Sequence, residues 1–355
     1  MQVREAVYKL NAWAAVVVSF PERNASDCLQ VGDADPSQVN PNATSLLREA
    51  VTQGNASYDP MGACQVIYVQ ARDQTTYDSY VMPQLAMLQT QITAKFGPMW
   101  TRQTLENTSI PISNLQAAPQ ALSPAIGFSQ YNLRPFTPAA ATPAVTIGLI
   151  YLIIIAFFSF SFFLPIYMKF VVPEGHPVIP FWKLTVIRYL GANAAYFFMS
   201  LSYSLISLAF QIPFSNQGAP DTSVAEHANA YGKGTFVVYW MVNFVGMSAL
   251  GMACENVAML VGQPWTALWL IFWVITNVST SFYAIDLSPK FYYWGYAWPL
   301  QNIVEASRSL LFDLHSRLGL NFGVLFCWVA VNSTVFPFSC WFMRWKEERA
   351  KQKEG

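Results

Sequence analysis

Glu255 is the side chain whose type and position in this sequence point most directly to chemistry. It lies inside an apolar run long enough to cross a membrane. An acid at that depth costs about 3 kcal/mol or more unless it faces protein or water. We therefore expect Glu255 to carry ions or substrate, or else to form a helix–helix hydrogen bond or lie close enough to the membrane surface to be hydrated. Asn256 follows it, and Ser248 lies two helical turns earlier on nearly the same face.

Two further polar residues in apolar runs could belong to the same site. Arg188, near the start of another run, is a candidate partner of Glu255; alternatively, its long side chain reaches the lipid headgroups. Asn277 belongs to a polar stripe between Thr276 and Ser281 that could line a path through the protein. Such residues more often form hydrogen bonds between helices, so both interpretations stay open.

The sequence carries none of the common motifs of enzymes or nucleotide sites. It has no phosphate-binding G-x-x-x-x-G-K-[ST] loop, no G-x-S-x-G and no H-E-x-x-H. Its five cysteines lack the C-x-x-C spacing of zinc sites, and His176, His227 and His315 lie in three separate loops. The formal net charge of zero gives no argument for nucleic acid. We expect no enzyme activity, no cofactor, no metal and no nucleic-acid partner.

The elements that would position the polar residues are helices in a membrane. The chain is 54% hydrophobic and 11% charged, whereas a soluble domain is about 25% charged. A hydrocarbon layer of about 30 Å needs about 20 apolar residues. We therefore predict a multi-pass α-helical membrane protein whose bundle covers residues 143–343, with five spans at 145–168, 186–212, 235–262, 265–287 and 321–343. Gln263, Pro264 and Trp265 would turn the chain between the third and fourth spans.

Two segments of the C-terminal part fall outside these spans. Residues 288–320 begin with aromatic residues and then repeat apolar residues at helical spacing, as in Ile303, Ala306 and Leu310. We expect an external hairpin or interfacial helix there, which caps the bundle rather than crossing the membrane. Residues 344–355 are rich in lysine and arginine and are predicted to be a cytoplasmic tail.

Residues 1–142 are predicted to fold as a soluble domain of the α/β or α+β class. The runs 12–20 and 62–71 are rich in strand-forming residues, and a third strand is expected near 128–133. One helix should begin at about residue 42, and a longer helical pattern covers residues 75–107. We expect Pro83 to kink this long helix and Gly97-Pro98 to break it.

The segment 19–39 is polar, lacks periodicity and is interpreted as an insertion. It contains Cys28, which could form a disulfide with Cys64 if the domain faces an oxidising compartment. Two free thiols are the alternative.

Charges beside the spans predict the orientation in the membrane. Eight basic residues flank one side and four the other, and the more basic side is expected to be cytoplasmic. Residues 1–142 would then lie outside the cytosol. Four N-x-[ST] glycosylation sequons fall in this part, at Asn24, Asn42, Asn55 and Asn107. We expect the plasma membrane as the location, with the endoplasmic reticulum or another endomembrane as the alternative.

Long runs of the sequence resemble the fungal nitrosoguanidine-resistance membrane protein family. The runs are YDPMGACQVIYVQARDQTTYDSYVMPQL (58–85), GMACENVAMLVGQPWTALWLIFWVITNVSTSFYAI (251–285) and YYWGYAWPLQNIVEASRSLLFD (292–313). Members resemble ABC-2-type permeases, in which one span precedes a large external domain and five spans follow it. No hydrophobic segment precedes the soluble part here, so we expect an N-terminal anchor to be missing from this chain.

This resemblance implies a role in drug resistance and stress tolerance. With no phosphate loop in the chain, export would draw energy from a separate ATPase or from a proton gradient acting through Glu255. The expected partners are membrane lipids, such an ATPase or another membrane protein, and a second copy of the chain. A membrane organiser that affects lipid distribution without transporting a compound is the alternative.

Overall fold

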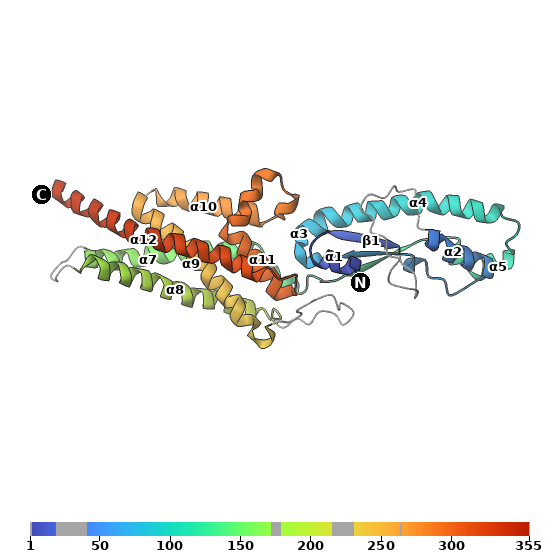
Figure 1. Ribbon diagram of the computed structural model, residues 1–355, viewed down its shortest axis with the longest axis horizontal. Coiled ribbons are helices and arrows are strands. Elements are labelled where there is room, and N and C mark those ends of the chain that lie inside the picture. The colour runs from blue at the N-terminus through green and yellow to red at the C-terminus, as the bar shows by residue number, and fades with distance from the viewer. Residues whose placement is uncertain (1, 19–40, 172–178, 215–230, 263–264, 355) are drawn as a thin grey trace. The chain divides into compact units, whose positions relative to one another are not determined.

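The computed structural model describes residues 2–18, 41–171, 179–214, 231–262 and 265–354. The chain divides into two compact units between Phe136 and Thr137. We call residues 2–18 and 41–136 the N-terminal unit, and the described residues from 137 onward the helical unit (Figure 1). The segment 19–39, with Asn24 and Cys28, lies outside the described residues, as do Gln263 and Pro264.

The N-terminal unit is built on a three-stranded mixed sheet. Its strands are β1 (Ala14–Val18), β2 (Cys64–Tyr68) and β3 (Phe128–Asn132), in that order across the sheet. β1 pairs antiparallel with β2, and β3 pairs parallel with β2. A parallel pair needs a long crossover connection, and the helices between β2 and β3 supply it. All three strands fall in or beside the runs that their β-branched and aromatic residues predict.

Five α-helices belong to this unit: α1 (Gln2–Tyr8), α2 (Pro41–Gln53), α3 (Gln74–Thr76), α4 (Met82–Glu106) and α5 (Ile112–Ala117). The prediction that Gly97-Pro98 break the long helix is wrong, because α4 continues through both residues. Pro98 cannot bond to the carbonyl group of Ala94, but both residues are exposed, so water can satisfy that carbonyl. Pro83 lies in the first turn of α4, where proline is tolerated, directly after a π-helical turn.

Aromatic side chains fill the core of the N-terminal unit. Trp100 of α4 is buried and donates its indole N–H to the carbonyl oxygen of Ala121, at 2.9 Å. Tyr68 of β2 stacks on Tyr77, with 4.5 Å between the ring centroids. Cys64 is buried beside them as a free thiol, and burial raises its pKa to about 11. A thiol with that pKa stays protonated and unreactive at neutral pH.

The helical unit is organised around α9 (Thr235–Val261). Every residue of this helix from Val245 to Asn256 is buried. Because α9 is apolar all round, it can be surrounded on all sides. Figure 1 shows it running between its neighbours, which are α7 (Ile150–Val171), α8 (Phe181–Ala209), α10 (Thr266–Ser281), α11 (Pro299–Phe312) and α12 (Leu318–Glu354). The short helix α6 (Thr142–Val145) precedes them.

Three helices of the described residues are long and apolar enough to cross a membrane. They contain the segments Ile150–Tyr167, Gly232–Val261 and Leu318–Arg349. The sequence predicts two more spans, in the regions of α8 and α10. α10 is apolar but has only 16 residues, and α8 has 29 residues but a more polar composition.

The polar residues of α8 face inward. Its buried side includes Arg188, Tyr196, Ser200, Tyr203, Ser204 and Ser207. Its exposed side includes Trp182, Val186, Ile187, Leu190, Phe198, Leu205, Ile206 and Leu208. A surface helix of a soluble protein has the opposite distribution, with the apolar stripe toward the core. The low mean hydropathy of α8 therefore comes from its buried face, while its outer face is apolar.

The segment predicted as an external hairpin contains α11, which has 14 residues and is almost entirely buried against α9, α10 and α12. A cluster of tryptophans joins the same elements. Trp273 of α10 is 1% exposed, and its ring centroid lies 5.8 Å from that of Trp298 and 5.4 Å from that of Trp328 of α12. α12 continues as a helix through most of the basic tail.

Candidate functional site

The candidate site is a buried ion pair between α8 and α9. Arg188 lies about two turns from the start of α8, and Glu255 lies less than two turns before the end of α9. The two ends meet because the helices follow one another in the chain and pack lengthwise in opposite directions. The side chains are 0% and 2% exposed, and Arg188 Nη2 donates to Glu255 Oε1 at 3.1 Å.

Two more helices complete the surroundings of Arg188. From α7, the ring of Tyr167 lies 4.8 Å from the guanidinium carbon, which is a cation–π distance. From α12, Met343 Sδ accepts a hydrogen bond from Arg188 Nη1 at 3.4 Å. Arg188 Nε has no hydrogen-bond partner among the described residues. The guanidinium group of Arg188 in α8 thus contacts side chains of three other helices, and among the described residues its only strong acceptor is the carboxylate of Glu255.

The electrostatics of this pair favour a contact that can open and close over a contact that adds much stability. Removing two charges from water costs several kcal/mol per ion, and their mutual attraction offsets this cost only with good geometry and further hydrogen bonds. Loss of either charge, by protonation or by displacement, leaves the other charge buried without a partner. Side chains of α7, α9 and α12 thus meet at Arg188 of α8, and Glu255 supplies the negative charge at this junction.

The other predicted polar residues lie at neighbouring junctions. Asn256 Nδ2 donates to the carbonyl oxygen of Asn332 at 3.0 Å, and Asn332 Nδ2 donates to the carbonyl oxygen of Ala249 at 3.3 Å. These bonds join α9 to α12 one residue away from Glu255. Ser248 is 2% exposed and its hydroxyl has no partner among the described residues.

Asn277 serves a different junction, at the start of α11. Its Oδ1 accepts the backbone N–H of Leu300 at 3.2 Å. Helix starts leave unpaired N–H groups, and α11 has no side-chain cap from the residue that precedes it. Asn277 of α10 therefore accepts one of the unpaired N–H groups at the start of α11. Among the described residues it has no hydrogen bond to Glu255 or Arg188.

Sequence reasoning missed Tyr167, Met343 and Asn332. Tyrosine and methionine are common in apolar spans, so neither residue type marks a contact with a buried arginine. Asn332 stands out in the sequence only as a sequon inside a predicted span. An amide at that depth needs a hydrogen-bond partner, and this was the available signal.

The predicted modification residues belong to the N-terminal unit. Asn55 and Asn107 are exposed, and each side-chain oxygen accepts the backbone N–H two residues later, at 3.0 Å and 3.1 Å. The backbone of Asn42 lies in the first turn of α2. The Cys28–Cys64 disulfide stays a prediction, because Cys28 lies outside the described residues.

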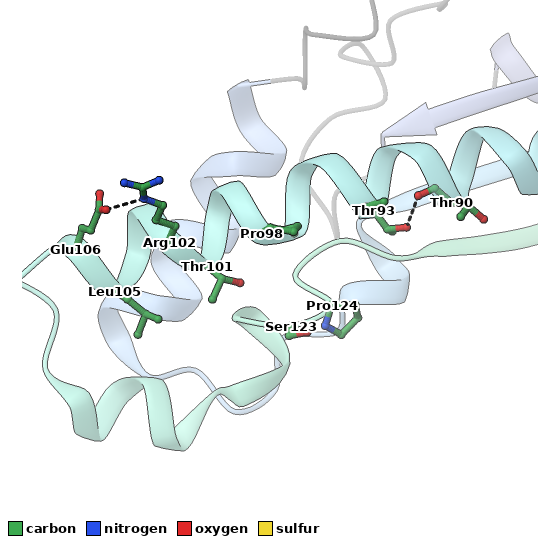
Figure 2. A pocket seen from close by; sticks show the side chains of 11 residues that line it. Thr90, Thr93, Pro98, Thr101, Arg102, Leu105, Glu106, Ser123 and Pro124 are labelled. Atoms are coloured by element: carbon green, nitrogen blue, oxygen red, sulfur yellow. Dashed lines mark hydrogen bonds and ion pairs between the residues drawn. The ribbon is translucent and has the colours of Figure 1, made fainter.

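An open groove of about 900 Å³ lies on the N-terminal unit beside α4 (Figure 2). One side is the small-residue face of α4 at Thr93, Gly97 and Thr101, and the other side contains Ser123 and Pro124. Nothing lies within 4 Å of the position that a Cβ atom on Gly97 would take. The groove is wide and mostly apolar, and its few polar groups do not converge on one point.

Among the described residues, no three His, Cys, Asp or Glu side chains come together as a metal site. His315 lies in the segment between α11 and α12, whereas His176 and His227 lie outside the described residues.

Three apolar helices long enough to cross a membrane, with hydrophobic side chains facing outward, support a helical membrane protein. The chain belongs to the DUF3533 family of proteins of unknown function, whose model matches residues 37–334. It is similar to a Saccharomyces cerevisiae protein named as an uncharacterized endoplasmic reticulum membrane protein, with 28% identity over 309 residues. This match covers 84% of the chain but only 57% of the relative. No solved structure matches the chain.

Proposed function

We propose that the chain is a permease-like membrane protein that exports toxic compounds and so contributes to drug resistance. The observation that supports this most directly is the Arg188–Glu255 pair at the junction of four helices. An ionisable residue at membrane depth that faces the bundle interior is a mark of transport pathways and proton relays. Opening and closing of the pair would rearrange α7, α8, α9 and α12 around a passing compound.

The same proposal includes five spans. α8 extends about 43 Å at 1.5 Å per residue, which exceeds the hydrocarbon thickness of about 30 Å. Its apolar outer face suits lipid and its polar face suits the bundle interior. α10 is the shortest span, and its exposed residues Leu268, Ile271, Phe272 and Ile275 are also apolar.

The location and partners are part of the proposal. The similar yeast protein is named for the endoplasmic reticulum membrane, which supports our alternative location over the plasma membrane. In either membrane the N-terminal unit would lie outside the cytosol. Because the sequence has no phosphate loop, a separate ATPase or a proton gradient would supply energy, and a second copy of the chain could contribute to the pathway.

We predict glycans on Asn55 and Asn107 if the N-terminal unit lies outside the cytosol. Both side chains are exposed at the ends of helices, where a transferase can reach them. Replacing either by Gln should remove one step from the mobility shift that a glycosidase produces. Asn332→Gln is the control, since this sequon residue is buried in α12 and should carry no glycan. No glycosidase shift in the wild-type protein would contradict the proposed orientation.

A neutral version of the pair tests export itself. Arg188→Met combined with Glu255→Leu removes both charges and leaves no unpaired ion, so the protein should fold. We expect cells with this double variant to lose resistance while the protein stays at normal abundance. The control is Arg344→Met with Glu348→Leu, which removes an exposed ion pair of 3.0 Å from α12. Normal resistance with the neutral Arg188–Glu255 pair would remove that pair from the mechanism.

A non-transport organiser that affects lipid distribution is the second candidate, and close packing of α9 favours it. A Cβ atom on Gly246 would lie 2.4 Å from Ile303 Cδ1, and one on Gly251 would lie 2.6 Å from Tyr196 Cζ. Such contact suits a bundle that stays closed. Purified protein in liposomes distinguishes the two: movement of a compound supports export, and altered lipid exposure in deletion cells without such movement supports the organiser.

A further inference from the structure

Buried polar residues recur along the interface between α8 and α9. We call it the α8–α9 seam and define it by Arg188, Tyr196, Ser200, Ser204 and Ser207 on α8, and by Thr235, Tyr239, Asn243, Ser248 and Glu255 on α9. All ten residues are buried. A seam of this kind is more than two spans need in order to associate, because small apolar residues suffice for close packing.

Hydrogen bonds connect the half of the seam that is remote from Glu255. Ser207 Oγ lies 3.1 Å from the hydroxyl of Tyr239. One turn further, Asn243 Nδ2 donates to Ser204 Oγ at 3.0 Å. Ser200 Oγ, the next hydroxyl along α8, accepts the indole N–H of Trp240 at 3.2 Å. The Ser204 and Ser200 hydroxyls in turn donate to carbonyl oxygens of their own helix, those of Ser200 and Phe197, so hydroxyl groups follow one another along α8 at intervals of about one helical turn.

Gly251 lies on α9 where the seam approaches the ion pair. A Cβ atom on Gly251 would lie 2.7 Å from the hydroxyl oxygen of Tyr196, so only glycine lets this hydroxyl approach α9 so closely. Gly251 is four residues, about one turn, before Glu255. Ser248 lies one turn earlier still. The hydroxyls of Tyr196 and Ser248 therefore lie between the Ser204–Asn243 contact and Glu255.

Several buried polar atoms of the seam have no hydrogen-bond partner among the described residues. They are Asn243 Oδ1, Ser248 Oγ, the hydroxyl oxygen of Tyr196 and Arg188 Nε. Buried polar atoms are rarely left unsatisfied, and such atoms at intervals along one interface indicate places where water binds. Water at these atoms would join the separate hydroxyls into one hydrogen-bonded chain.

We propose that the α8–α9 seam conducts protons from its Thr235 end to the carboxylate of Glu255, and that proton movement drives the export proposed above. A hydronium ion at the Thr235 end gives up a proton and becomes water. The proton passes by exchange of O–H bonds through water and hydroxyl groups, and an O–H bond forms on Glu255. Arg188 then loses its anionic partner, the contact among four helices opens, and the later loss of the proton to the opposite side restores it.

The groups around Glu255 support a proton over a metal ion. Arg188 and Tyr196 of α8, Tyr167 of α7 and Cys340 of α12 face it, and Cys254 is its neighbour on α9. Tyrosine and cysteine ordinarily ionise only at a pH of about 10 and about 8.5, so Glu255 is the acidic group among these that can exchange a proton most readily. A hard cation would need about six oxygen ligands, whereas a proton needs one oxygen atom.

Reconstitution of the full chain in liposomes that contain a pH-sensitive dye tests this inference. An inside-negative potential, set with potassium and valinomycin, should drive proton uptake by the wild-type protein. Ser204→Ala and Asn243→Leu should each slow uptake about tenfold, which corresponds to a barrier higher by about 1.4 kcal/mol. Ser202→Ala is the matched control, because Ser202 lies two residues away on the exposed face of α8 and bonds only to its own helix. Ser204→Thr keeps a hydroxyl and should keep uptake.

Two results would overturn the proton path: wild-type uptake no faster than in protein-free liposomes, or equal uptake by the Ser204→Ala and Ser202→Ala variants. Compound movement is measured in the same liposomes, with and without a proton ionophore. Movement that the ionophore leaves unchanged would reject proton coupling and leave export intact. Proton uptake with no compound movement would reject export and leave the path along the seam intact.

Discussion

Replacing Glu255 by Ala is expected to lower the free energy of unfolding of the helical unit by about 3–5 kcal/mol. The substitution leaves Arg188 fully buried, with Nη1 on a weak sulfur acceptor and Nε without a partner among the described residues. A desolvated cation in that state is far less stable than the ion pair it replaces. Denaturant titration of the purified protein in detergent, followed by tryptophan fluorescence, measures the change.

Two controls separate the unpaired charge from the loss of side-chain volume. Glu348→Ala removes an acid from an exposed pair on α12 and should change stability by no more than about 0.5 kcal/mol. Adding Arg188→Met to Glu255→Leu should restore most of the lost stability, because no charge then remains buried. A Glu255→Ala protein as stable as the wild type would show that Arg188 does not need Glu255 as a partner, and the stabilising role of the ion pair would be refuted.

Replacing Trp273 by Ala is expected to cost about 3–5 kcal/mol, the usual range for deleting a buried large aromatic side chain. Trp273 touches Trp269 within α10, at 5.5 Å between centroids, and also reaches Trp298 and Trp328. Removing the ring leaves a large cavity where α10 meets α12 and the segment before α11. The same titration in detergent gives the loss of stability, and increased proteolysis at residues 282–298 would report the loosened segment.

The matched control is Trp265→Ala at the start of α10. Trp265 is 59% exposed, so its truncation removes little buried area and should change stability by no more than about 1 kcal/mol. Trp273→Phe keeps most of the packing and should fall between the two. Equal effects of the substitutions at positions 265 and 273 would mean that tryptophan content, and not the cluster around Trp273, stabilises α10.

Features set by residues near one another in sequence could be predicted. The apolar runs gave the positions of α7, α9 and α12, since hydrophobic length depends on composition alone. Val-rich and aromatic runs predicted the three strands. Glu255 was singled out because a carboxylate in an apolar run needs a partner, and Arg188 was one of few candidates in the same part of the chain.

Features that depend on contacts between distant residues could not be predicted. Tyr167 and Met343 lie beside Arg188 only because four helices converge, and residue type marks neither of them in a chain with 17 tyrosines and 12 methionines. Pro98 was expected to end a helix, but tolerance of a missing bond depends on whether water reaches the free carbonyl, which is a property of the folded surface. The polar residues of α8 lower its mean hydropathy. Only the packing of the helices shows that these residues lie on its buried side.

The inward-facing polar residues of α8 have a consequence for how the protein is made. An arginine inside an inserting helix adds to its cost of entering lipid, up to about 3 kcal/mol at the helix centre, and the serines of α8 do not offset that cost. A helix with the composition of α8 therefore partitions poorly by itself. In the five-span arrangement proposed here, α8 would wait at the translocon until α9 emerges and supplies Glu255 and Asn243 as partners. The two helices would then leave for the bilayer as one unit, so biosynthesis would depend on α9 being translated intact.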